Sequence, residues 1–402
     1  MNAVEKSLKK ILYIVNGIWA IPFVVCVRLI APWYLIRFGT FSTTRIGGFV
    51  PETAHRLAEN AVTKNRSIDL YWLDSPTCND QWEAMVIRNF NVYRFVKYLA
   101  RWNSFIPLGR KHHLKSTYTA QRDIFGVLER SKTKMEFTTK EEATSIKWMK
   151  EQGWREGQPF VCLQVRDSEY LKTIENDAGV NFNYHNYRDS DIDSYVPAME
   201  WLADNGVWVF RMGKVMSKRI ASNHKNVIDY AFHQKKSDLL DVWLFAKCDL
   251  CITTGTGPDM ISDVYRRPLL VINYLPLRIP WSWSNALHYP KVLKWSKSGV
   301  KLTLKEYMKH SYMRSDGYSN NGISVTNMKE EEILKVVQEC WGRLDNNKGF
   351  SKDELKQQQC FWSACKSTPD FSKYNNWIHP ESGVSMTFLK NHPDFLATNE
   401  SE

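Results

Sequence analysis

The sequence predicts an α/β fold built on parallel sheets, and three observations lead to this prediction. Short, continuously apolar segments recur along the second half of the chain, and amphipathic helical segments with recognisable ends separate them. Strands that are apolar on both faces are typical of a parallel sheet that helices cover on both sides. The length of 402 residues exceeds what one typical core accommodates, so we expect two domains.

The amino terminus is the most apolar part of the chain. Residues 11–27 form a nearly unbroken apolar run with basic residues on both sides. The run is borderline for a membrane span, which takes roughly 20 residues, and no cleavage site of a signal peptide follows it. We interpret residues 1–38 as a membrane-associating segment, embedded or lying in the plane of the membrane, with Trp19, Trp33 and Tyr34 as interfacial anchors. A buried helical hairpin is the alternative.

Residues 39–150 are expected to form a first α/β domain. The β-branched and aromatic run Ser67–Leu73 predicts a strand, and residues 81–102 carry apolar side chains at helical spacing. Upstream, a Gly-Gly turn leads into another helix. Residues 138–154 begin with Thr-Thr, continue with acidic residues and approach their end at a glycine, which predicts a capped helix that links the two domains.

Residues 151–350 show the alternation of strand and helix most regularly and are expected to form the second domain. Its predicted strands are 160–165, 207–213, 226–232, 249–255 and 268–276. The helices between them are expected at 190–206, 237–248 and 258–267, with Ser190 or Asp191 and then Ser237 as caps. Residues 351–402 add one more helix and a tail.

Composition narrows the classes of partner. The net charge of +11 favours anionic partners. Nucleic acid is disfavoured, because the chain has no arginine-rich helix with interleaved aromatic residues and no zinc-finger spacing. Acidic lipid and phosphorylated small molecules remain. Among eight cysteines, Cys248 and Cys251 form one C-x-x-C without a second pair, so we predict core packing of reduced cysteines and no metal site.

Polar residues follow the predicted strands at the edge where parallel sheets bind ligands. Arg166 and Asp167 follow the first of these strands, and Arg211, Gly213 and Lys214 lie at the end of the second. An arginine at a strand end can hold a diphosphate through two parallel hydrogen bonds. A structural ion pair with a nearby aspartate is the alternative for Arg166. A further polar run, 185–189, either lines a pocket or caps the helix after it.

The run Thr-Thr-Gly-Thr-Gly-Pro at 253–258 lies between a buried strand and a helix start. Unpaired N–H groups at the start of a helix make an anion site. The run is neither a Walker loop nor the dinucleotide-binding fingerprint, and a purely structural turn is the alternative. Because it shares a sheet edge with Arg166 and Arg211, we expect a nucleotide diphosphate there. The residues assigned to it are Thr254, Gly255, Thr256, Gly257 and Pro258.

Taken in order, several motifs resemble a family of bacterial glycosyltransferases linked to surface polysaccharide synthesis. They are TRIGGFVPE, FVCLQVRDSEYL, HNYRDSDIDSY, VFRMGK, IDYAF, DLLDVWLFAKCDLCITTGTGPDMISDVYRRPLLVINYLP and SGVSMTFLKNHPDFL, which span roughly residues 40–396. The resemblance implies a GT-B-like architecture, in which two Rossmann-like domains face a cleft and the donor nucleotide lies on the carboxyl-terminal one. It implies no metal and no cofactor besides the donor substrate. One position departs from the family pattern: Gly48 stands where a histidine is expected.

From these residues we also assign roles to individual side chains. Arg166, helped by Arg211 or Lys214, would neutralise the leaving diphosphate, and Tyr230 would contact the base or ribose. Asp167 and His185 are the first candidates for the general base, with Glu52 and His55 behind them. The acceptor-side residues are Arg45, Gly47, Gly48 and Glu52.

The resulting hypothesis is sugar transfer from a nucleotide-diphosphate sugar to a glycan or lipid-linked acceptor, on the cytoplasmic side of the inner membrane. The expected partners are the nucleotide sugar, the acceptor and the membrane surface, and no nucleic acid. Two alternatives stay open. One is a nucleotide-sugar epimerase, which needs no acceptor and no membrane. The other is a non-catalytic, membrane-bound assembly protein with a degenerate nucleotide fold, which the departure at Gly48 favours.

Overall fold

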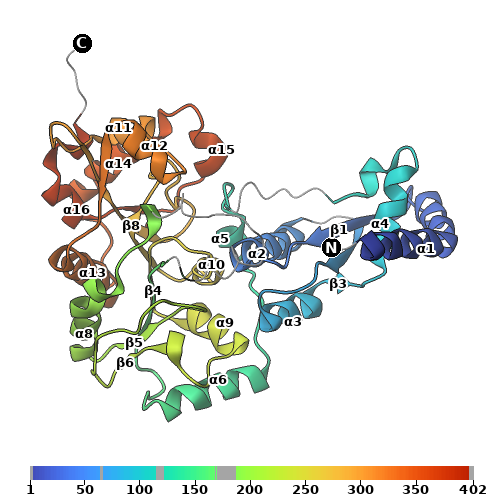
Figure 1. Ribbon diagram of the computed structural model, residues 1–402, viewed down its shortest axis with the longest axis horizontal. Helices are drawn as coiled ribbons and strands as arrows, with labels where there is room; N and C mark the ends of the chain where they lie inside the picture. The colour runs from blue at the N-terminus through green and yellow to red at the C-terminus, as the bar shows by residue number, and fades with distance from the viewer. Residues whose placement is uncertain (1–2, 64–66, 115–121, 168, 170–186, 398–402) are drawn as a thin grey trace. The chain divides into compact units, whose positions relative to one another are not determined.

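A computed structural model describes residues 3–63, 67–114, 122–167, 169 and 187–397 (Figure 1). The chain divides into two compact units. Unit 1 holds residues 1–121 and 130–137, and unit 2 holds residues 122–129 and 138–402. Each unit contains a parallel sheet with helices packed against it, which confirms the predicted α/β class.

Unit 1 is built on a three-stranded parallel sheet in the order β1-β2-β3. Its strands are β1 (Leu35–Phe41), β2 (Ser67–Leu73) and β3 (Asn91–Val92), and β2 lies where the sequence predicts a strand. Its helices are α1 (Ala3–Leu29), α2 (Ile46–Val62), α3 (Asp80–Asn89), α4 (Val96–Phe105) and the short η1 (Gly109–His112). Helix α2 begins at Ile46, so the Gly-Gly pair expected in a turn lies in the first turn of this helix.

The single helix predicted over residues 81–102 is wrong. The chain leaves α3 after Asn89, forms β3 beside β2, and only then begins α4. Phe90 explains the interruption, because its buried ring packs edge-on and tilted against Tyr71 and Phe41 of the sheet, with centroids 5.3 and 5.2 Å away. Apolar spacing alone does not distinguish this arrangement from one continuous helix.

The amino-terminal segment is the single helix α1, which packs against α4. No helix among the described residues is both long enough and apolar enough to cross a membrane.

Unit 2 is built on a seven-stranded sheet in the order β12-β9-β8-β7-β4-β5-β6, and its described strands all pair in parallel. The strands are β4 (Phe160–Gln164), β5 (Trp208–Arg211), β6 (Val227–Ile228), β7 (Leu250–Thr253), β8 (Leu269–Tyr274), β9 (Ala286–Pro290) and β12 (Gly383–Val384). Counted from β4, the order is that of a Rossmann fold: three strands run outward in one direction, and the fourth starts on the other side of the first. The carboxyl-terminal tail supplies β12, an edge strand beyond β9.

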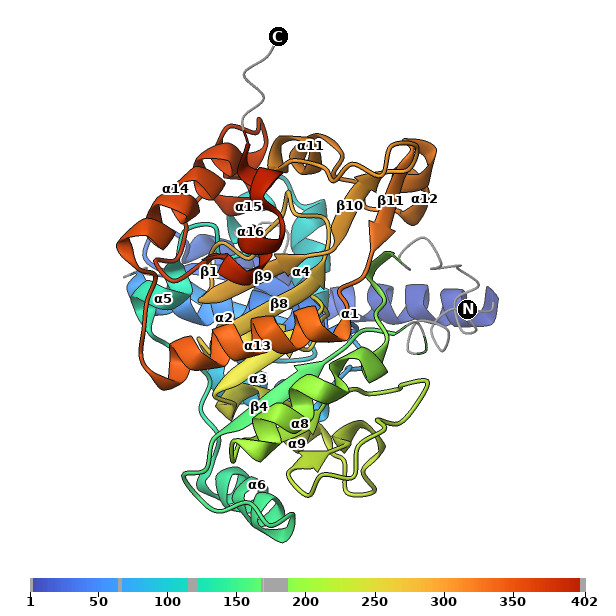
Figure 2. The same cartoon turned by 90° about the vertical axis from the view of Figure 1, so that its left-hand side faces the viewer.

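Helices cover both faces of this sheet. Figure 2 shows α8 (Val196–Asp204) and α13 (Glu330–Asp345) across one face, where they contact each other. On the other face, the ring of Phe160 in β4 stacks on Trp243 of α9 (Asp238–Lys247). The other elements of unit 2 are α5 (Val127–Ser131, which crosses the unit boundary), α6 (Thr139–Glu151), η3 (Ile192–Tyr195), η4 (Tyr230–Phe232), α10 (Met260–Val264), β10 (Val292–Trp295), α11 (Leu304–Lys309), α12 (Ser315–Asn320), β11 (Ile323–Thr326), α14 (Lys352–Lys366), α15 (Phe371–Asn375), α16 (Met386–Asn391) and η5 (Pro393–Leu396).

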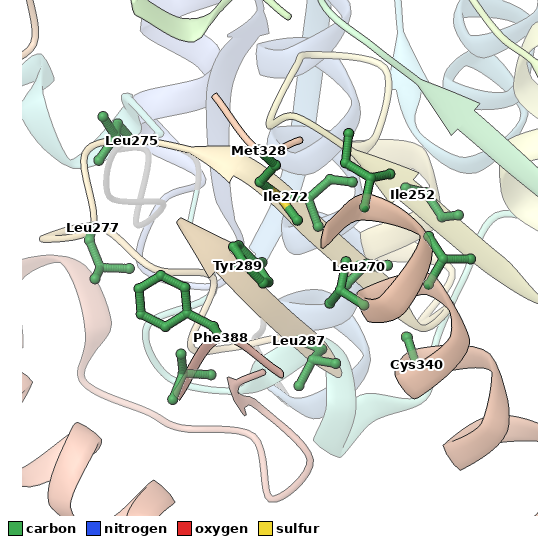
Figure 3. Close-up of a cluster of buried hydrophobic side chains, with 14 of the residues drawn as sticks. Ile252, Leu270, Ile272, Leu275, Leu277, Leu287, Tyr289, Met328, Cys340 and Phe388 are labelled. Atoms are coloured by element: carbon green, nitrogen blue, oxygen red, sulfur yellow. The ribbon is translucent and has the colours of Figure 1, made fainter. Parts of the chain in front are cut away.

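The core of unit 2 lies between the sheet and the α8–α13 layer. Figure 3 shows Leu270 and Ile272 of β8 beside Leu287 and Tyr289 of β9, with Cys340 of α13 packed over them.

Local signals set the helix starts as predicted. Thr138 forms a capping box with Glu141 at α6, and Ser237 accepts a hydrogen bond from the Leu240 amide at α9. The two cysteines of the C-x-x-C are fully buried and free, as core packing predicts.

His288 of β9 makes the fold sensitive to acid. Its Nε2 accepts a hydrogen bond from the Trp281 amide (2.9 Å), so Nδ1 carries the proton and donates to the Gly383 carbonyl (2.8 Å). Burial lowers the pKa of this neutral ring to about 4 from 6.5. Between these values the unfolded chain binds the proton more readily, so stability falls as the pH falls through this range.

We therefore expect His288 alone to reduce the free energy of unfolding by about 2 kcal/mol between pH 7.5 and pH 5. The measurement is urea unfolding of wild type and His288→Gln at both pH values. The variant is expected to be less stable at pH 7.5, but its free energy of unfolding falls less than that of the wild type when the pH is lowered to 5. An equal loss in both proteins would contradict the assignment to His288.

Candidate active site

The switch point of the unit 2 sheet lies between β4 and β7, where the strand order reverses. Ligands of such sheets bind beyond the carboxyl ends of the strands at this point. Residues just past the two strands are joined there: the Arg166 amide donates to Thr254 Oγ1 (3.0 Å), and the Thr254 amide donates to the Gln164 carbonyl (3.2 Å). The structure thus brings together two segments that the sequence assigns to one site.

Three cations meet at this edge: Arg166, Arg188 and Lys291. Arg166 Nε donates to Asp189 Oδ1 (3.1 Å), and Lys291 Nζ donates to the Asp189 carbonyl oxygen (2.7 Å). The guanidinium of Arg188 donates to the Gly255 carbonyl oxygen in the loop after β7. Lys291 is only 2% exposed. We call these three residues the cation cluster.

Each cation of this cluster disfavours the protonated form of its neighbours. Burial lowers the pKa of Arg166, and the charge of Arg188 lowers it further. Burial lowers the pKa of Lys291 to about 8, and the two arginines add to that effect. Asp189 does not balance the cluster fully, because burial outweighs its ion pair and raises its own pKa. Keeping three protonated groups here costs free energy that an anionic ligand would recover.

Sequence reasoning missed two of the three cations. Arg188 belongs to the polar run 185–189, in which it was not singled out. Lys291 follows β9, a strand that the sequence analysis does not predict. A signal exists, because Lys291 comes directly after the apolar strand Ala286–Pro290 and thus reaches the same sheet edge as Arg166. His185 lies outside the described residues.

The loop at 253–258 differs from the prediction. Helix α10 begins only at Met260 and has five residues. The Gly255 amide donates to Thr253 Oγ1 (3.0 Å), and the Thr256 amide donates to Asp259 Oδ2 (2.6 Å). The prediction that these two amides are available to a phosphate is therefore wrong, because acceptors of the chain itself occupy them.

The same contacts show what this loop does instead. Gly255 has φ +77°, and a Cβ there would lie 2.7 Å from the Tyr274 ring, so only glycine fits. Its carbonyl oxygen accepts from Arg188. The loop therefore positions a cation of the cluster. The remaining residues assigned to it, Gly257 and Pro258, stay a prediction.

Asp259 holds this loop together. Its side chain is fully buried, accepts from Thr253 Oγ1 (2.7 Å) as well as from the Thr256 amide, and has its pKa raised by burial to about 7. Asp259→Ala leaves both donors without this acceptor, so we expect the free energy of unfolding to fall by about 2 kcal/mol. Urea unfolding measures it. Asp259→Asn keeps one side-chain oxygen and is expected to lose less; equal losses in the two variants would contradict this role.

Two further predicted donor residues make contacts within the fold. Tyr230 is fully buried and donates to Asp241 Oδ1 (2.8 Å), so the expectation that it contacts a base or ribose is wrong. Arg211 is 1% exposed and pairs with Asp229 (3.0 Å). Lys214 is exposed, and its carbonyl oxygen accepts from Lys236 Nζ (2.7 Å).

A cavity of about 330 Å³ is lined by Asp189, the ion-pair partner of Arg166. Asp167 lines it, but Asp167 Oδ2 accepts from both the amide and the hydroxyl of Ser217 (2.9 Å each), so this carboxylate anchors the neighbouring loop. Gly213 has φ +152°, and a Cβ there would lie 2.5 Å from Met216 of the cavity wall. The lining residues are Val165, Asp167, Asp189, Ser190, Asp191, Ile192, Arg211, Met216, Ser217, Lys218 and Asn327.

Asn273 fixes the position of the segment that carries Arg188 and Asp189. It is fully buried at φ +51°, a conformation that asparagine tolerates better than most residues. Its Nδ2 donates to Ser190 Oγ (3.1 Å) and Tyr195 Oη (2.9 Å), and its Oδ1 accepts from the Met328 amide (2.8 Å). The sequence analysis did not identify this positioning residue.

Unit 1 contains a second group of polar residues around α2. A cavity of about 30 Å³ is lined there by Gly39, Thr40, Phe41, Glu52, His55, Arg56, Glu59, Tyr71 and Leu114. Burial raises the pKa of Glu52 against the opposing charge of Arg56. Arg56 itself pairs with Glu59 (3.0 Å). Of the other acceptor-side residues, Arg45 is exposed just before α2, and Gly47 and Gly48 lie in its first turn.

Within the described ranges, no cluster of three or more His, Cys, Asp or Glu side chains is placed to hold a metal ion. Independence from metal stays a prediction.

Comparisons with known proteins give structural similarities only. No protein-family model matches the sequence, and no curated protein matches it significantly. A glycosyl transferase family 9 structure from Veillonella parvula is similar over 78% of this chain and 98% of its own, with 11% identity and a TM-score of 0.44. The E. coli ADP-heptose LPS heptosyltransferase II is similar over 59% of this chain and 84% of its own, with 10% identity and a TM-score of 0.34. The E. coli heptosyltransferase WaaC with ADP is similar over 63% of this chain and 91% of its own, with 12% identity and a TM-score of 0.32.

These three structures are glycosyltransferases, the class that the sequence motifs resemble. Their identities and TM-scores are low, so the function of this chain is argued from its own residues.

Proposed function

We propose that the protein transfers a sugar from a nucleoside-diphosphate sugar to a hydroxyl group of an acceptor. The observation that carries the proposal is the cation cluster at the switch point of a Rossmann-type sheet. Arg166 and Arg188 come from the segments after β4 and before α8, and Lys291 comes from the end of β9. Two guanidinium groups and one ammonium group at one sheet edge match the two phosphates of such a donor.

In the proposed reaction, the acceptor oxygen bonds to the anomeric carbon of the sugar. The bond between that carbon and the phosphate oxygen breaks, and the nucleoside diphosphate leaves. Negative charge grows on the leaving oxygen, and the cluster stabilises it there more than in the bound donor. The acceptor hydroxyl loses its proton to a general base.

Glu52 is our proposed base. It lines a cavity, and its raised pKa brings it closer to the range in which a carboxylate removes a proton efficiently. Asp167 is the weaker candidate, because both of its oxygens already accept hydrogen bonds from the chain: Oδ2 from Ser217 and Oδ1 from the Glu169 amide.

We further propose that the acceptor is a glycan or lipid-linked molecule of surface polysaccharide synthesis. The protein would act on the cytoplasmic side of the inner membrane, held there by residues 1–38. The basic character of the chain and its exposed apolar amino-terminal helix support this placement.

A thermal-shift panel tests the donor site. Wild type, Arg166→Ala and the control Arg155→Ala are heated with ADP, GDP, UDP or CMP, each with and without EDTA. Arg155 is exposed and precedes β4, so it lies at the opposite edge of the sheet from the cluster and its loss leaves the site intact. A nucleoside diphosphate at a hundred times its dissociation constant stabilises wild type and the control by roughly 2.7 kcal/mol. No shift in wild type with any of the four, or an equal shift in Arg166→Ala, would refute the proposed donor site.

A further inference from the structure

We propose that unit 1 binds the surface of an anionic lipid bilayer through a composite face, made by the exposed side of α1 together with α4 and the loop at 106–109. This deepens the membrane association proposed above, which assigned it to residues 1–38 alone. It is independent of the reaction and of the donor site. Figure 1 shows α1 alongside α4.

Helix α1 is fixed to unit 1 along one narrow stripe. Gly17, Ala20, Val24 and Val27 are buried against the α4 side of the unit. A Cβ at Gly17 would lie 2.6 Å from the Trp102 ring of α4, so the two helices approach closely at this point. The helix therefore lies along the folded unit, and its other side forms part of the surface of that unit.

That other side is apolar and continues onto α4. Ile14 and Ile18 are 67% and 79% exposed. The Trp19 ring packs edge-on against Phe95 (6.2 Å between centroids), and Phe95 stacks on Tyr93 (5.3 Å). All three aromatic side chains are themselves exposed. Monomeric soluble proteins rarely expose a large continuous apolar patch, so such a face marks a binding surface.

The loop after α4 presents one more apolar side chain. Leu108 is 88% exposed and has φ +65°, a conformation that is unfavourable for leucine. Arg28 of α1 holds the loop, because its guanidinium donates to Asn103 Oδ1 (2.7 Å), to the Ile106 carbonyl oxygen (3.0 Å) and to the Pro107 carbonyl oxygen. A strained, largely exposed leucine in a loop that hydrogen bonds hold in place favours a role outside the fold.

Charge identifies the partner as anionic. Residues 6–51 contain six Lys or Arg and no Asp or Glu, and residues 84–122 contain eight and none. Arg101, whose guanidinium lies over the Phe105 ring (4.7 Å), is exposed, as are Arg110 and Lys111 beside Leu108. An apolar face with a basic border is typical of a structure that lies in the interfacial plane of an anionic membrane.

Vesicle co-sedimentation of the full chain tests the proposal. The vesicles are phosphatidylcholine alone, or phosphatidylcholine mixed with phosphatidylglycerol. We expect binding to the mixed vesicles that weakens with salt. Arg110→Gln with Lys111→Gln is expected to weaken it by about fivefold per charge. Leu108→Asn, which suits the left-handed backbone, is expected to weaken it about tenfold. Leu355→Gln replaces an exposed leucine of α14 in unit 2 and serves as the matched control.

Each outcome decides a separate point. Equal binding to both vesicle types, or no binding to either, refutes an anionic bilayer as the partner. Binding that Ile18→Asp abolishes and Leu108→Asn leaves unchanged shows that α1 acts alone, which refutes the composite face but not the association itself. If light scattering shows a dimer that Ile18→Asp dissociates, a second copy of the chain covers the face and the proposal fails. Unchanged melting temperatures of the variants exclude misfolding as the cause.

Discussion

Replacing Glu52 with glutamine is expected to lower kcat by about 1,000-fold while the KM for the donor changes little. The expectation follows from the proposed role, because a general base acts in the transition state and contributes on this order. Glutamine keeps the size of the side chain but accepts no proton. The rate is measured as release of the nucleoside diphosphate from its sugar, with the nucleotide that the thermal-shift panel identifies.

The pH profile separates this role from a structural one. Burial raises the pKa of Glu52, so the deprotonated, active form accumulates at a higher pH than for an ordinary glutamate. Activity of the wild type should therefore rise with pH along an acidic limb that Glu52→Gln lacks. Glu59→Gln is the matched control, because Glu59 lines the same cavity but is paired with Arg56. A variant at Glu52 that keeps the wild-type kcat and acidic limb would exclude it as the base.

Replacing Lys291 with methionine is expected to weaken binding of a nucleoside diphosphate by about 100- to 1,000-fold, the usual cost of removing one partner of a buried charged contact. The same change is expected to stabilise the unliganded protein or leave its stability unchanged. Lys291 is buried beside Arg166 and Arg188, and its lowered pKa shows that the protonated form is disfavoured there. Calorimetric titration and thermal unfolding measure the two effects.

Weaker binding of the diphosphate together with increased or unchanged stability of the unliganded protein is the decisive result for Lys291. The pH dependence follows the same logic. Between its pKa of about 8 in the fold and 10.5 in the unfolded chain, the unfolded state binds more protons, so this residue makes stability rise with pH across that window. Affinity for the diphosphate falls over the same window, because Lys291 loses its charge. Lys297→Met, at an exposed position nearby in sequence, is the control; equal effects of the two variants would place Lys291 outside the donor site.

Local patterns in the sequence predict much of unit 2. Continuously apolar runs predict β4, β5, β7 and β8, because a strand buried on both faces tolerates few polar residues. Thr138 and Ser237 predict helix starts, because a cap acts within three residues of itself. The same reasoning fails over residues 81–102, where helical spacing hides the pairing of β3 with β2, whose partner residues lie 21 positions earlier in the chain.

The candidate site is less predictable than the strands around it. Sequence position placed Arg166 and the loop after β7 at one sheet edge, and the structure joins them there. Sequence position did not reveal that Asp259 accepts a hydrogen bond from the Thr256 amide, although the two residues are only three apart and form a visible Thr-x-x-Asp pattern. Tyr230 was misassigned, because a tyrosine at a strand end looks the same in sequence whether it points outward or into the core.

The sequence by itself determined the α/β class, the sheet edge to inspect and the basic, apolar character of the amino terminus. Each of these depends on the composition of a continuous segment. Only the tertiary structure decided which charges meet. Lys291 reaches the carbonyl of Asp189 across 102 residues, and Arg28 holds a loop that begins 78 residues later. Contacts of this kind depend on strand order and helix packing, which bring distant segments together and which no local pattern records.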